Sequence, residues 1–470
     1  MIEPKLGADT LGAPLPGERN SIYWWETEEV SPGQPLRGTE RADVCIVGGG
    51  YTGLWTAYHL KQAEPSLDVA VVERSWAGSG ASGHNDGYAM TLLDMSLHHL
   101  VERHGPERAG AAHEAVARSV IEIGEFCAEH DVDAEYERNG FAAIAVNDGH
   151  MWRLERDLEA AERIGAEQDF RLLEGEAARA VIGSPIVRGV LKEGRGALLN
   201  PHKLVRGLAR AVEELGVRIH ERSPATSVVA GRVETELGAV QAPRIVVATN
   251  AYQHTFPQFR SKVVPLWSYA MATEPLTNDQ RGRVAWPGRE GFEDKRNFIT
   301  IGRPTADGRI LWGGRLAPYF FGNDMDLRHL SNERVFAELR EAWARYFPMW
   351  RDVTFTHAYG GCVAITSTFL PYVGSLGDGV FYGYGYNGHG VAPSHTVART
   401  LCDLLLDRES EYTDLLFVNQ DKEPGLPPEP LRFLGTRLTT ALLDRQDRRM
   451  DRGGAAAEMD PLLLRVINRL

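Results

Sequence analysis

Residues 42–73 read ADVCIVGGGYTGLWTAYHLKQAEPSLDVAVVE, and the expected architecture follows from this segment. An apolar run at 43–47 enters three glycines, a helical pattern covers 52–62, and a second apolar run covers 68–72. Strand, turn, helix and strand within about 30 residues form the βαβ unit of a parallel sheet. We therefore expect an α/β protein with a parallel, Rossmann-like sheet.

The turn inside this unit matches GxGxxG, with Gly48, Gly50 and Gly53 at the glycine positions. The first glycine permits the tight turn, the second lets the backbone approach a pyrophosphate, and the third allows close packing of helix and strand. Glu73 follows 20 residues after Gly53, where a carboxylate accepts hydrogen bonds from a ribose diol and disfavours a 2′-phosphate. The alternative is a glycine-rich turn without a ligand.

A second GxGxxG occurs at 383–388, but a helix predicted through about Leu406 follows it, without a returning strand that ends in an acid. This segment is therefore not a second nucleotide-binding unit. Gly388 and Gly390 are expected to place a loop and a helix N-terminus against an electron-rich group. A simple packing turn is the alternative.

The composition excludes several classes of protein. The 470 residues carry a net charge of −13, which argues against nucleic acid or an anionic membrane as a partner. The four cysteines are scattered, so neither a disulfide framework nor a metal site is expected. The N-terminal residues do not resemble a secretion signal, and no apolar run is long enough for a membrane span. We expect a cytoplasmic protein.

Several further segments carry recognisable motifs. They are ADVCIVGGGYTGLWTAYHL, AVVERSWAGSGASGHNDGY, LLNPHKLVRGLARAVEELGVRIHE, IVVATNAY, RPTADGRILWGGR, FLPYVG and GVFYGYGYNGHGVAPSH. Together they span 42–395 and resemble, in order, the D-amino-acid oxidase superfamily of FAD-dependent oxidoreductases. The branch that they resemble includes sarcosine oxidase, glycine oxidase and gamma-glutamylputrescine oxidoreductase.

This resemblance implies a Rossmann-like FAD-binding domain interleaved with an α+β substrate domain that contains a mixed, largely antiparallel sheet. The FAD domain is expected at 1–95, 195–260 and 355–420, the substrate domain at 96–194 and 261–354, and a C-terminal tail at 421–470. The cofactor-binding residues expected from the motif and the resemblance are Gly48, Gly50, Tyr51, Thr52, Gly53, Glu73, Arg74, Gly80, Ala81, Ser82, His84, Asn85, Val228, Asn250, Cys362, Gly385, Asn387, Gly388, His389 and Gly390.

The chain departs from the branch at 80–87, which reads GASGHNDG where GASGRNGG is usual, so that His84 and Asp86 replace arginine and glycine. His84 has the offset at which a related dehydrogenase branch holds FAD covalently. It is a candidate for such a bond, with a hydrogen-bonding histidine as the favoured alternative. Cys362 is a second, less favoured candidate, because sarcosine oxidase has a cysteine nearby.

A third departure concerns the electron acceptor. Sarcosine oxidases place a lysine above the flavin, and the corresponding residue here is Leu311. The missing cation weakens the prediction of an oxidase that uses oxygen. It leaves open a dehydrogenase that passes electrons to another acceptor, such as a quinone or a protein.

The implied reaction is oxidation of a C–N bond in an amine or amino acid, by hydride transfer to FAD, with hydrolysis of the imine to a carbonyl. Such a reaction depends on positioning and a dry pocket. Arg303 could pair with a substrate carboxylate or phosphonate. The candidate residues for substrate contact, each of which has a core or surface position as its alternative, are His357, Tyr359, Trp267, Tyr269 and Arg303.

Two other functions remain open at this point. The chain could be the flavin-carrying subunit of a multi-subunit amine dehydrogenase, or an NAD-dependent enzyme that uses only the first glycine motif. A yellow purified protein would eliminate the NAD-dependent alternative.

Overall fold

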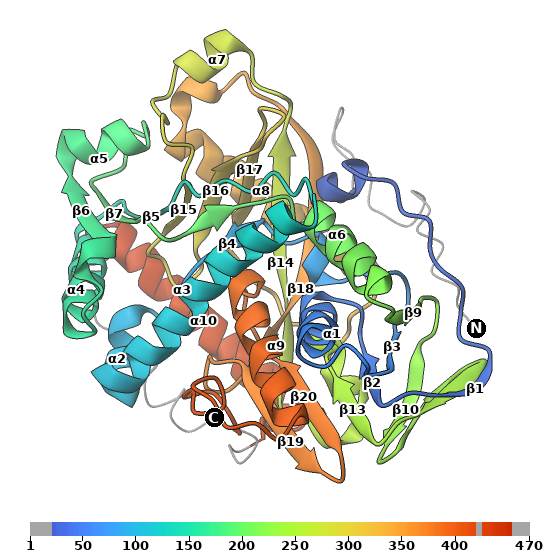
Figure 1. Ribbon diagram of the computed structural model, residues 1–470. Helices are drawn as coiled ribbons and strands as arrows, with labels where there is room; N and C mark the ends of the chain where they lie inside the picture. Colours follow the sequence, from blue (N-terminus) through green and yellow to red (C-terminus); the bar gives the residue numbers. More distant parts are fainter. Residues whose placement is uncertain (1–20, 420–424, 454–470) are drawn as a thin grey trace.

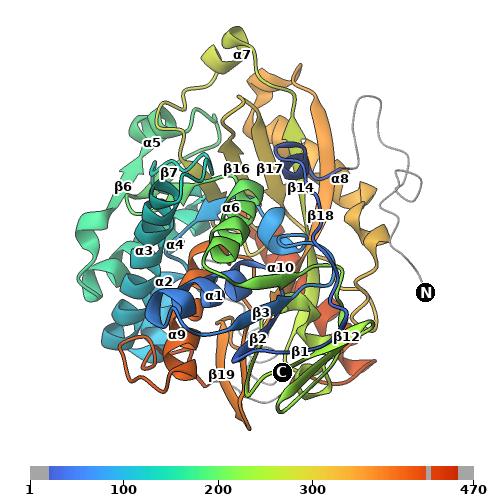
Figure 2. The same cartoon turned by 45° about the vertical axis from the view of Figure 1, so that its right-hand side comes forward.

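The computed structural model describes residues 21–419 and 425–453 (Figure 1). Its strands form two large sheets and two small ones. Helices cover the outer faces of the large sheets, and Figure 2 shows the same arrangement from a second direction. Among the described residues, no helix is long and apolar enough to cross a membrane.

A six-stranded sheet has the order β19-β20-β13-β2-β3-β9 and is parallel except for β19. Its central strands β2 and β3 are buried at every residue, which explains why their sequences VCIV and VAVV are continuously apolar. The strand bounds are β2 Val44–Val47, β3 Val69–Val72, β9 Arg218–His220, β13 Arg244–Val247, β19 Tyr372–Gly377 and β20 Val380–Tyr384.

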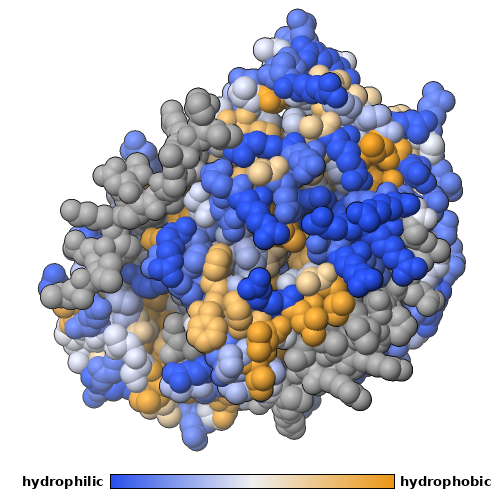
Figure 3. All heavy atoms as spheres, turned by 180° about the vertical axis from the view of Figure 1, so that it is seen from behind, coloured by the Kyte–Doolittle hydropathy of each residue, from blue (hydrophilic) through white to orange (hydrophobic). Residues whose placement is uncertain are grey.

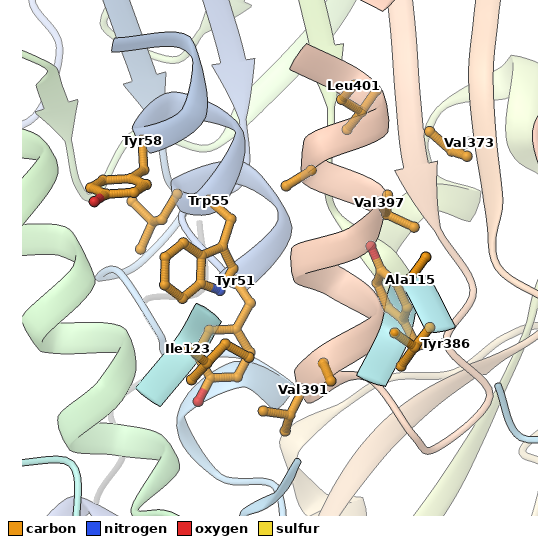
Figure 4. Close-up of a cluster of buried hydrophobic side chains, with 14 of the residues drawn as sticks. Tyr51, Trp55, Tyr58, Ala115, Ile123, Val373, Tyr386, Val391, Val397 and Leu401 are labelled. Atoms are coloured by element: carbon orange, nitrogen blue, oxygen red, sulfur yellow. The ribbon is translucent and has the colours of Figure 1, made fainter. Parts of the chain in front are cut away.

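Helices α1 (Tyr51–Ala63) and α9 (Val391–Leu405) lie side by side on this sheet. Figure 4 shows aromatic side chains of α1 and aliphatic side chains of α9 in one buried cluster. Helix α6 (Pro201–Glu214) packs on α1, and α3 (Pro106–Glu129) packs on α9.

An eight-stranded sheet has the order β18-β14-β17-β16-β15-β5-β7-β6 and is antiparallel except for the pair β15 and β5. Helix α8 (Glu333–Tyr346) packs against β14 and β17. The strand bounds are β5 Phe141–Ala145, β6 Phe170–Glu174, β7 Gly189–Glu193, β14 Val264–Thr273, β15 Gly291–Asp294, β16 Thr300–Pro304, β17 Ile310–Gly314 and β18 Phe355–Ile365.

The remaining elements are shorter or peripheral. A four-stranded sheet contains β1 (Gly38–Arg41), β12 (Gly238–Gln241), β11 (Arg232–Thr235) and β10 (Ala225–Val229), and a two-stranded sheet contains β4 (Tyr88–Ala89) and β8 (Ala197–Leu198). The other α-helices are α2 Leu97–His104, α4 Asp148–Arg163, α5 Gly175–Val181, α7 Asn278–Gly282 and α10 Leu431–Asp451. The 3₁₀ helices are η2 Tyr23–Glu26, η3 Ala81–Gly83, η4 Glu167–Asp169, η5 Asn250–Thr255, η6 Pro257–Phe259, η7 Leu327–Leu330 and η8 Pro348–Trp350.

The predicted fold class is confirmed, since a parallel Rossmann-like sheet stands beside a mixed, largely antiparallel one. Two segments differ in detail from the expected division. Strand β18 lies in the segment 355–420 that was assigned to the FAD domain, yet it pairs along its length with β14 in the eight-stranded sheet. Within the expected tail 421–470, residues 431–451 form α10, which Arg296 anchors through Asp451, with Nη1 and Oδ1 2.7 Å apart.

A buried ion pair holds three elements together beside α4. The Asp157 carboxylate of α4 accepts from the Lys295 ammonium group at 2.8 Å and from the backbone N–H of His98. His98 is the second residue of α2. Burial alone would raise the pKa of the Asp157 carboxyl, but Lys295 and His98 lower it below its usual range. The stabilisation is therefore present above the ordinary carboxyl pKa and is lost only in strong acid.

We predict that Asp157→Asn lowers the free energy of unfolding by about 3 kcal/mol at neutral pH, because it leaves Lys295 buried without its counter-ion. Asp148→Asn is the matched control on the same helix. The Asp148 side chain is 90% exposed, against 8% for Asp157, and its ion pair with Arg188 lies at the surface. The control should change stability by less than about 0.5 kcal/mol in urea unfolding. Equal effects of both substitutions would contradict the prediction.

Candidate active site

A cavity of about 1520 Å³ lies between the carboxyl ends of the six-stranded sheet and one face of the eight-stranded sheet. Val47, Val72 and Ala248 line it from the ends of β2, β3 and β13, and Ala270 and Tyr359 line it from β14 and β18. Small-molecule sites typically occupy about 300–1,000 Å³, so this cavity has room for a large cofactor together with a substrate.

The first glycine turn lies at one end of the cavity. Gly48 has a φ of 111°, and a Cβ there would stand 2.6 Å from the carbonyl oxygen of Ala248. Gly53 has no room for a side chain either, because a Cβ would overlap the carbonyl oxygen of Gly48. Helix α1 therefore starts directly against the end of β2. Gly50 is its N-cap and supplies no side-chain cap, which leaves the helix N-terminus available to an anion.

Glu73 stands beside this turn at the end of β3. Its carboxylate accepts from the backbone N–H of Gly49 at 2.8 Å and of Ser75 at 2.9 Å. Burial raises the pKa of this carboxyl, while these two hydrogen bonds oppose the shift. The carboxylate is thus held on the cavity wall, where the sequence places a ribose-binding acid. The neighbouring Arg74 lies over the Tyr252 ring, 4.1 Å from its centroid.

The second glycine-rich loop, at 383–390, lies on the opposite side of the cavity. The Asn250 Oδ1 accepts from the N–H of Gly385 at 3.0 Å, and the Asn387 Oδ1 accepts from the N–H of Thr366 at 2.8 Å. Both asparagines have positive φ, a conformation that asparagine tolerates well. Gly390 is the N-cap of α9 and has no side-chain cap, so the N-termini of α1 and α9 both open on the cavity.

His389, which precedes this N-cap, is clamped between two carboxylates. Its Nδ1 lies 2.6 Å from Asp94 Oδ1, and its Nε2 lies 3.2 Å from Glu293 Oε2. Burial would lower the pKa of the imidazole, but the hydrogen bonds to both acids raise it to about 10. A positive charge therefore stands on the cavity wall at neutral pH.

The two residues considered for covalent attachment lie close together. His84 Nε2 lies 3.0 Å from the position that a Cβ on Gly361 would take, and Cys362 is the next residue of β18. Burial, followed by the influence of His202, lowers the pKa of His84 to about 4, so its imidazole is neutral. Burial raises the pKa of the Cys362 thiol, which disfavours the nucleophilic thiolate.

Of the five candidate substrate-contact residues, two line the cavity and three do not. Tyr359 and Tyr269 line the cavity, and the Tyr269 hydroxyl donates to the carbonyl of His329 at 2.9 Å. Trp267 and His357 do not line it. The Trp267 indole points to the carbonyl of Asp324, and His357 lies 3.1 Å from Glu26, under the N-terminal segment.

The proposal that Arg303 pairs with a substrate carboxylate is not supported by its position. Its side chain is 2% exposed, and its Nη1 donates to the carbonyls of Asp86, Gly87 and Leu199. Through these hydrogen bonds, the guanidinium holds the loop that precedes β4. The sequence did not indicate this role, because the partners of Arg303 are backbone groups distant along the chain.

Most of the expected cofactor-binding residues line the cavity, with three exceptions: Gly53, Val228 and Gly385. Gly53 and Gly385 lie in the glycine turns behind the residues that line the cavity. Gly53 packs on the Gly48 carbonyl, and the Gly385 N–H donates to Asn250. Val228 pairs with Val233 inside the four-stranded sheet, whereas Ala225 of the same strand reaches the cavity. Leu311 packs with Trp24 and Tyr359 in a small apolar cluster and does not line the cavity.

Helices α4 and α10 form a further wall of the cavity, which the sequence did not indicate. Trp152, Arg153 and Arg156 line the cavity from α4, and Thr436 and Thr440 line it from α10. These residues belong to helices that carry no local motif. Only the position of each helix against the sheets brings them to the cavity.

The glycine turns, the two open helix N-termini and the acid at the end of β3 define a dinucleotide-binding protein of the Rossmann class. Comparison with known families makes this specific. Residues 43–404 match the DAO family, which is described as "FAD dependent oxidoreductase". The chain belongs to this family.

Individual relatives agree with this assignment. The chain is 30% identical over 438 residues to gamma-glutamylputrescine oxidoreductase of Escherichia coli K12, covering 91% of this chain and 98% of the relative. Among solved structures, it is similar to glycine oxidase from Geobacillus kaustophilus, with a TM-score of 0.66 and 18% identity over 79% of this chain and 96% of the other. L-proline dehydrogenase from P. horikoshii gives a TM-score of 0.68, with 17% identity over 81% and 96% of the two chains.

The residues present fit FAD. The Gly48 turn leaves a cradle without side chains, both helix N-termini offer N–H groups to a pyrophosphate or an electron-rich ring, and Glu73 is placed for a ribose. The buried Nδ1 of His84 has no hydrogen-bond partner in the part of the chain that the structure describes, although it adjoins this cavity.

We predict that Gly50→Val yields protein with at least about tenfold less FAD than the wild type, because the side chain blocks the approach of the pyrophosphate. A Cβ on Gly50 would also stand 2.9 Å from Ser82 Oγ, which now accepts from the N–H of Tyr51. The ratio of absorbance at the flavin band to protein absorbance measures the content. Gly282→Ala is the control, since a Cβ there meets no atom within 4 Å. Full flavin loading of Gly50→Val would contradict the site.

Proposed function

We propose that this protein oxidises the C–N bond of an amine or amino acid. The observation that carries the proposal is the cavity shared by the dinucleotide site and the antiparallel sheet, in a chain aligned over nearly the whole length of a gamma-glutamylputrescine oxidoreductase. The residues that would hold FAD are those of the two glycine turns, Glu73 and the 80–85 segment. When bound, FAD supplies a two-electron acceptor for a hydride, and the resulting imine is hydrolysed to a carbonyl.

The chain contributes positioning and electrostatics to this reaction. The N-terminus of α9 lies on one wall and favours negative charge nearby, while the protonated His389 is already paired with Asp94 and Glu293. Tyr359 and Ala270 form a buried surface on the opposite sheet and exclude water from the reacting bond. Burial raises the pKa of the Tyr359 hydroxyl well above its usual value, so this residue stays neutral.

The proposed domain division follows the two large sheets. We assign the six-stranded sheet with α1 and α9 to the FAD domain and the eight-stranded sheet to the substrate domain. In this division, β18 contributes to the substrate side.

An anaerobic screen tests the proposed function. Purified holoprotein is mixed with gamma-glutamylputrescine, putrescine, sarcosine, glycine, proline and an aminophosphonate, and bleaching of the flavin absorbance is followed. We expect at least one amine to bleach the flavin, and reoxidation by oxygen or by a quinone then identifies the class of acceptor. Full oxidation of the flavin in the presence of every amine would reject the proposal.

A second candidate function is that of a flavin-carrying subunit in a larger amine dehydrogenase. Two relatives are sarcosine oxidase subunits beta, from Rhodobacter capsulatus and Arthrobacter, at 23% and 22% identity. Hydrophobic side chains also form a band across the lower half of the face in Figure 3. The large apolar residues that α10 exposes are Leu431, Leu434 and Leu438. The mass and amine-dependent activity of the isolated chain distinguish this function from that of a stand-alone enzyme.

We predict that the rate of flavin reduction rises with pH between about pH 6 and about pH 10, because a protonated amine has no lone pair to support loss of hydride. Stopped-flow reduction with a saturating simple amine measures this dependence. A rate independent of pH over this range would make the mechanism untenable.

A further prediction concerns attachment of the flavin. We expect acid precipitation to release FAD into the supernatant, since the Cys362 thiol is protonated and His84 can serve as a neutral hydrogen-bonding neighbour. If the colour stays with the polypeptide, His84→Ala and Cys362→Ala identify the linked residue. The supporting measurement is the mass of the tryptic peptide that contains each residue.

A further inference from the structure

Asp86 presents a carboxylate to the cavity in a segment that the chain holds rigidly. Residues 84–87 connect η3 with β4, and Asp86 lines the cavity wall. Arg303 donates to the backbone carbonyls of Asp86 and Gly87, at 3.2 and 2.8 Å. Gly87 has a φ of 73°, and its carbonyl accepts from the N–H of Leu199 at 2.9 Å. The backbone that carries the carboxylate is therefore fixed before any ligand arrives.

The Asp86 carboxylate itself makes no hydrogen bond or ion pair within residues 21–419 and 425–453. The two cations near it are committed elsewhere. Arg303 bonds backbone carbonyls, and His389 is held by Asp94 and Glu293. Burial raises the pKa of this carboxyl to about 7, although Arg303 and His389 oppose the shift.

The other titratable groups that face Asp86 do not supply a partner. Tyr88 of β4 and Tyr359 of β18 interact with it electrostatically, but burial raises the pKa of both hydroxyls well above the usual value. Both are neutral near pH 7. A carboxylate left in such a position costs free energy, which a cationic group in the cavity would recover.

We propose that Asp86 binds the ammonium group of the substrate and accepts a proton from it. The proposal rests on the amine-oxidising function. One proton passes from R–NH₃⁺ to the Asp86 carboxylate, which becomes a carboxylic acid, and the neutral R–NH₂ keeps its lone pair. The carboxylic acid returns its proton to water when the product leaves. Asp86 thus selects cationic amines and prepares them for oxidation in one position.

Asp86→Asn tests the proton step. The variant keeps the size of the side chain and all the backbone bonds to Arg303, so FAD content and melting temperature should match the wild type. With an amine that bleaches the wild-type flavin, we expect reduction at pH 7 to slow by about 100-fold. The midpoint of the pH dependence should also move up by about one pH unit or more, because the amine must then lose its proton to solvent.

A binding measurement tests recognition independently of the reaction. n-Butylamine and the uncharged n-butanol are titrated into oxidised holoprotein under anaerobic conditions at pH 8, and their dissociation constants are read from the shift of the flavin spectrum or by calorimetry. Asp86→Asn should raise the dissociation constant of n-butylamine by at least about tenfold and leave that of n-butanol unchanged, because only the amine forms a charge-assisted hydrogen bond. Asp148→Asn, which changes an exposed acid on α4, serves as the control for both measurements.

The outcomes separate this proposal from the proposed function. If amines bleach the wild-type flavin, and if Asp86→Asn has the same reduction rate, the same pH midpoint and the same affinity for n-butylamine, the role of Asp86 is overturned. The amine-oxidising function would still stand. An equal loss of affinity for n-butylamine and n-butanol would also overturn this role, since the substitution would then have changed the shape of the site and not its charge. Absence of bleaching by every amine in the wild type would reject the amine-oxidising function instead.

Discussion

The contact between the start of α1 and the end of β2 is the constraint on which the site depends. Gly53 lies against the Gly48 carbonyl, where any side chain would collide, so the helix begins at the edge of the sheet. Thr52 Oγ1 of the same turn lies 2.6 Å from the Tyr386 hydroxyl, which ties the first glycine turn to the second. The two open helix N-termini are thereby fixed on one cavity, and a cofactor with both a pyrophosphate and an electron-rich ring can bridge them.

Charge is distributed unevenly along the cavity. The side near α9 combines one buried cation, His389, with three carboxylates, those of Asp86, Asp94 and Glu293. Two of these acids pair with the histidine, and the third, Asp86, makes no ion pair within the described residues. Such an arrangement suits an amine, because a cationic group enters a region whose own cations are already bound. The side near α4 carries Arg153 and Arg156 instead.

Much of the fold could be predicted because its signals are local. The apolar runs of β2, β3 and β13 and the glycine turn between β2 and α1 are contiguous in the sequence, and the end of the cavity that they form follows from them. The substrate half was predicted less well. Trp267, His357 and Arg303 looked suitable by residue type. In the structure, Trp267 reaches the carbonyl of Asp324, His357 lies beside Glu26, and Arg303 donates to backbone carbonyls.

By itself, the sequence determined the family and the glycine turn between β2 and α1, since both rest on short motifs whose residues are contiguous in the chain. Only the tertiary structure decided which side chains meet across the cavity. Asp86 was visible as a departure from the usual motif, yet its lack of a partner depends on Arg303 and His389, from distant elements. Pairings of this kind arise from the packing of one sheet against another, and no local pattern encodes them.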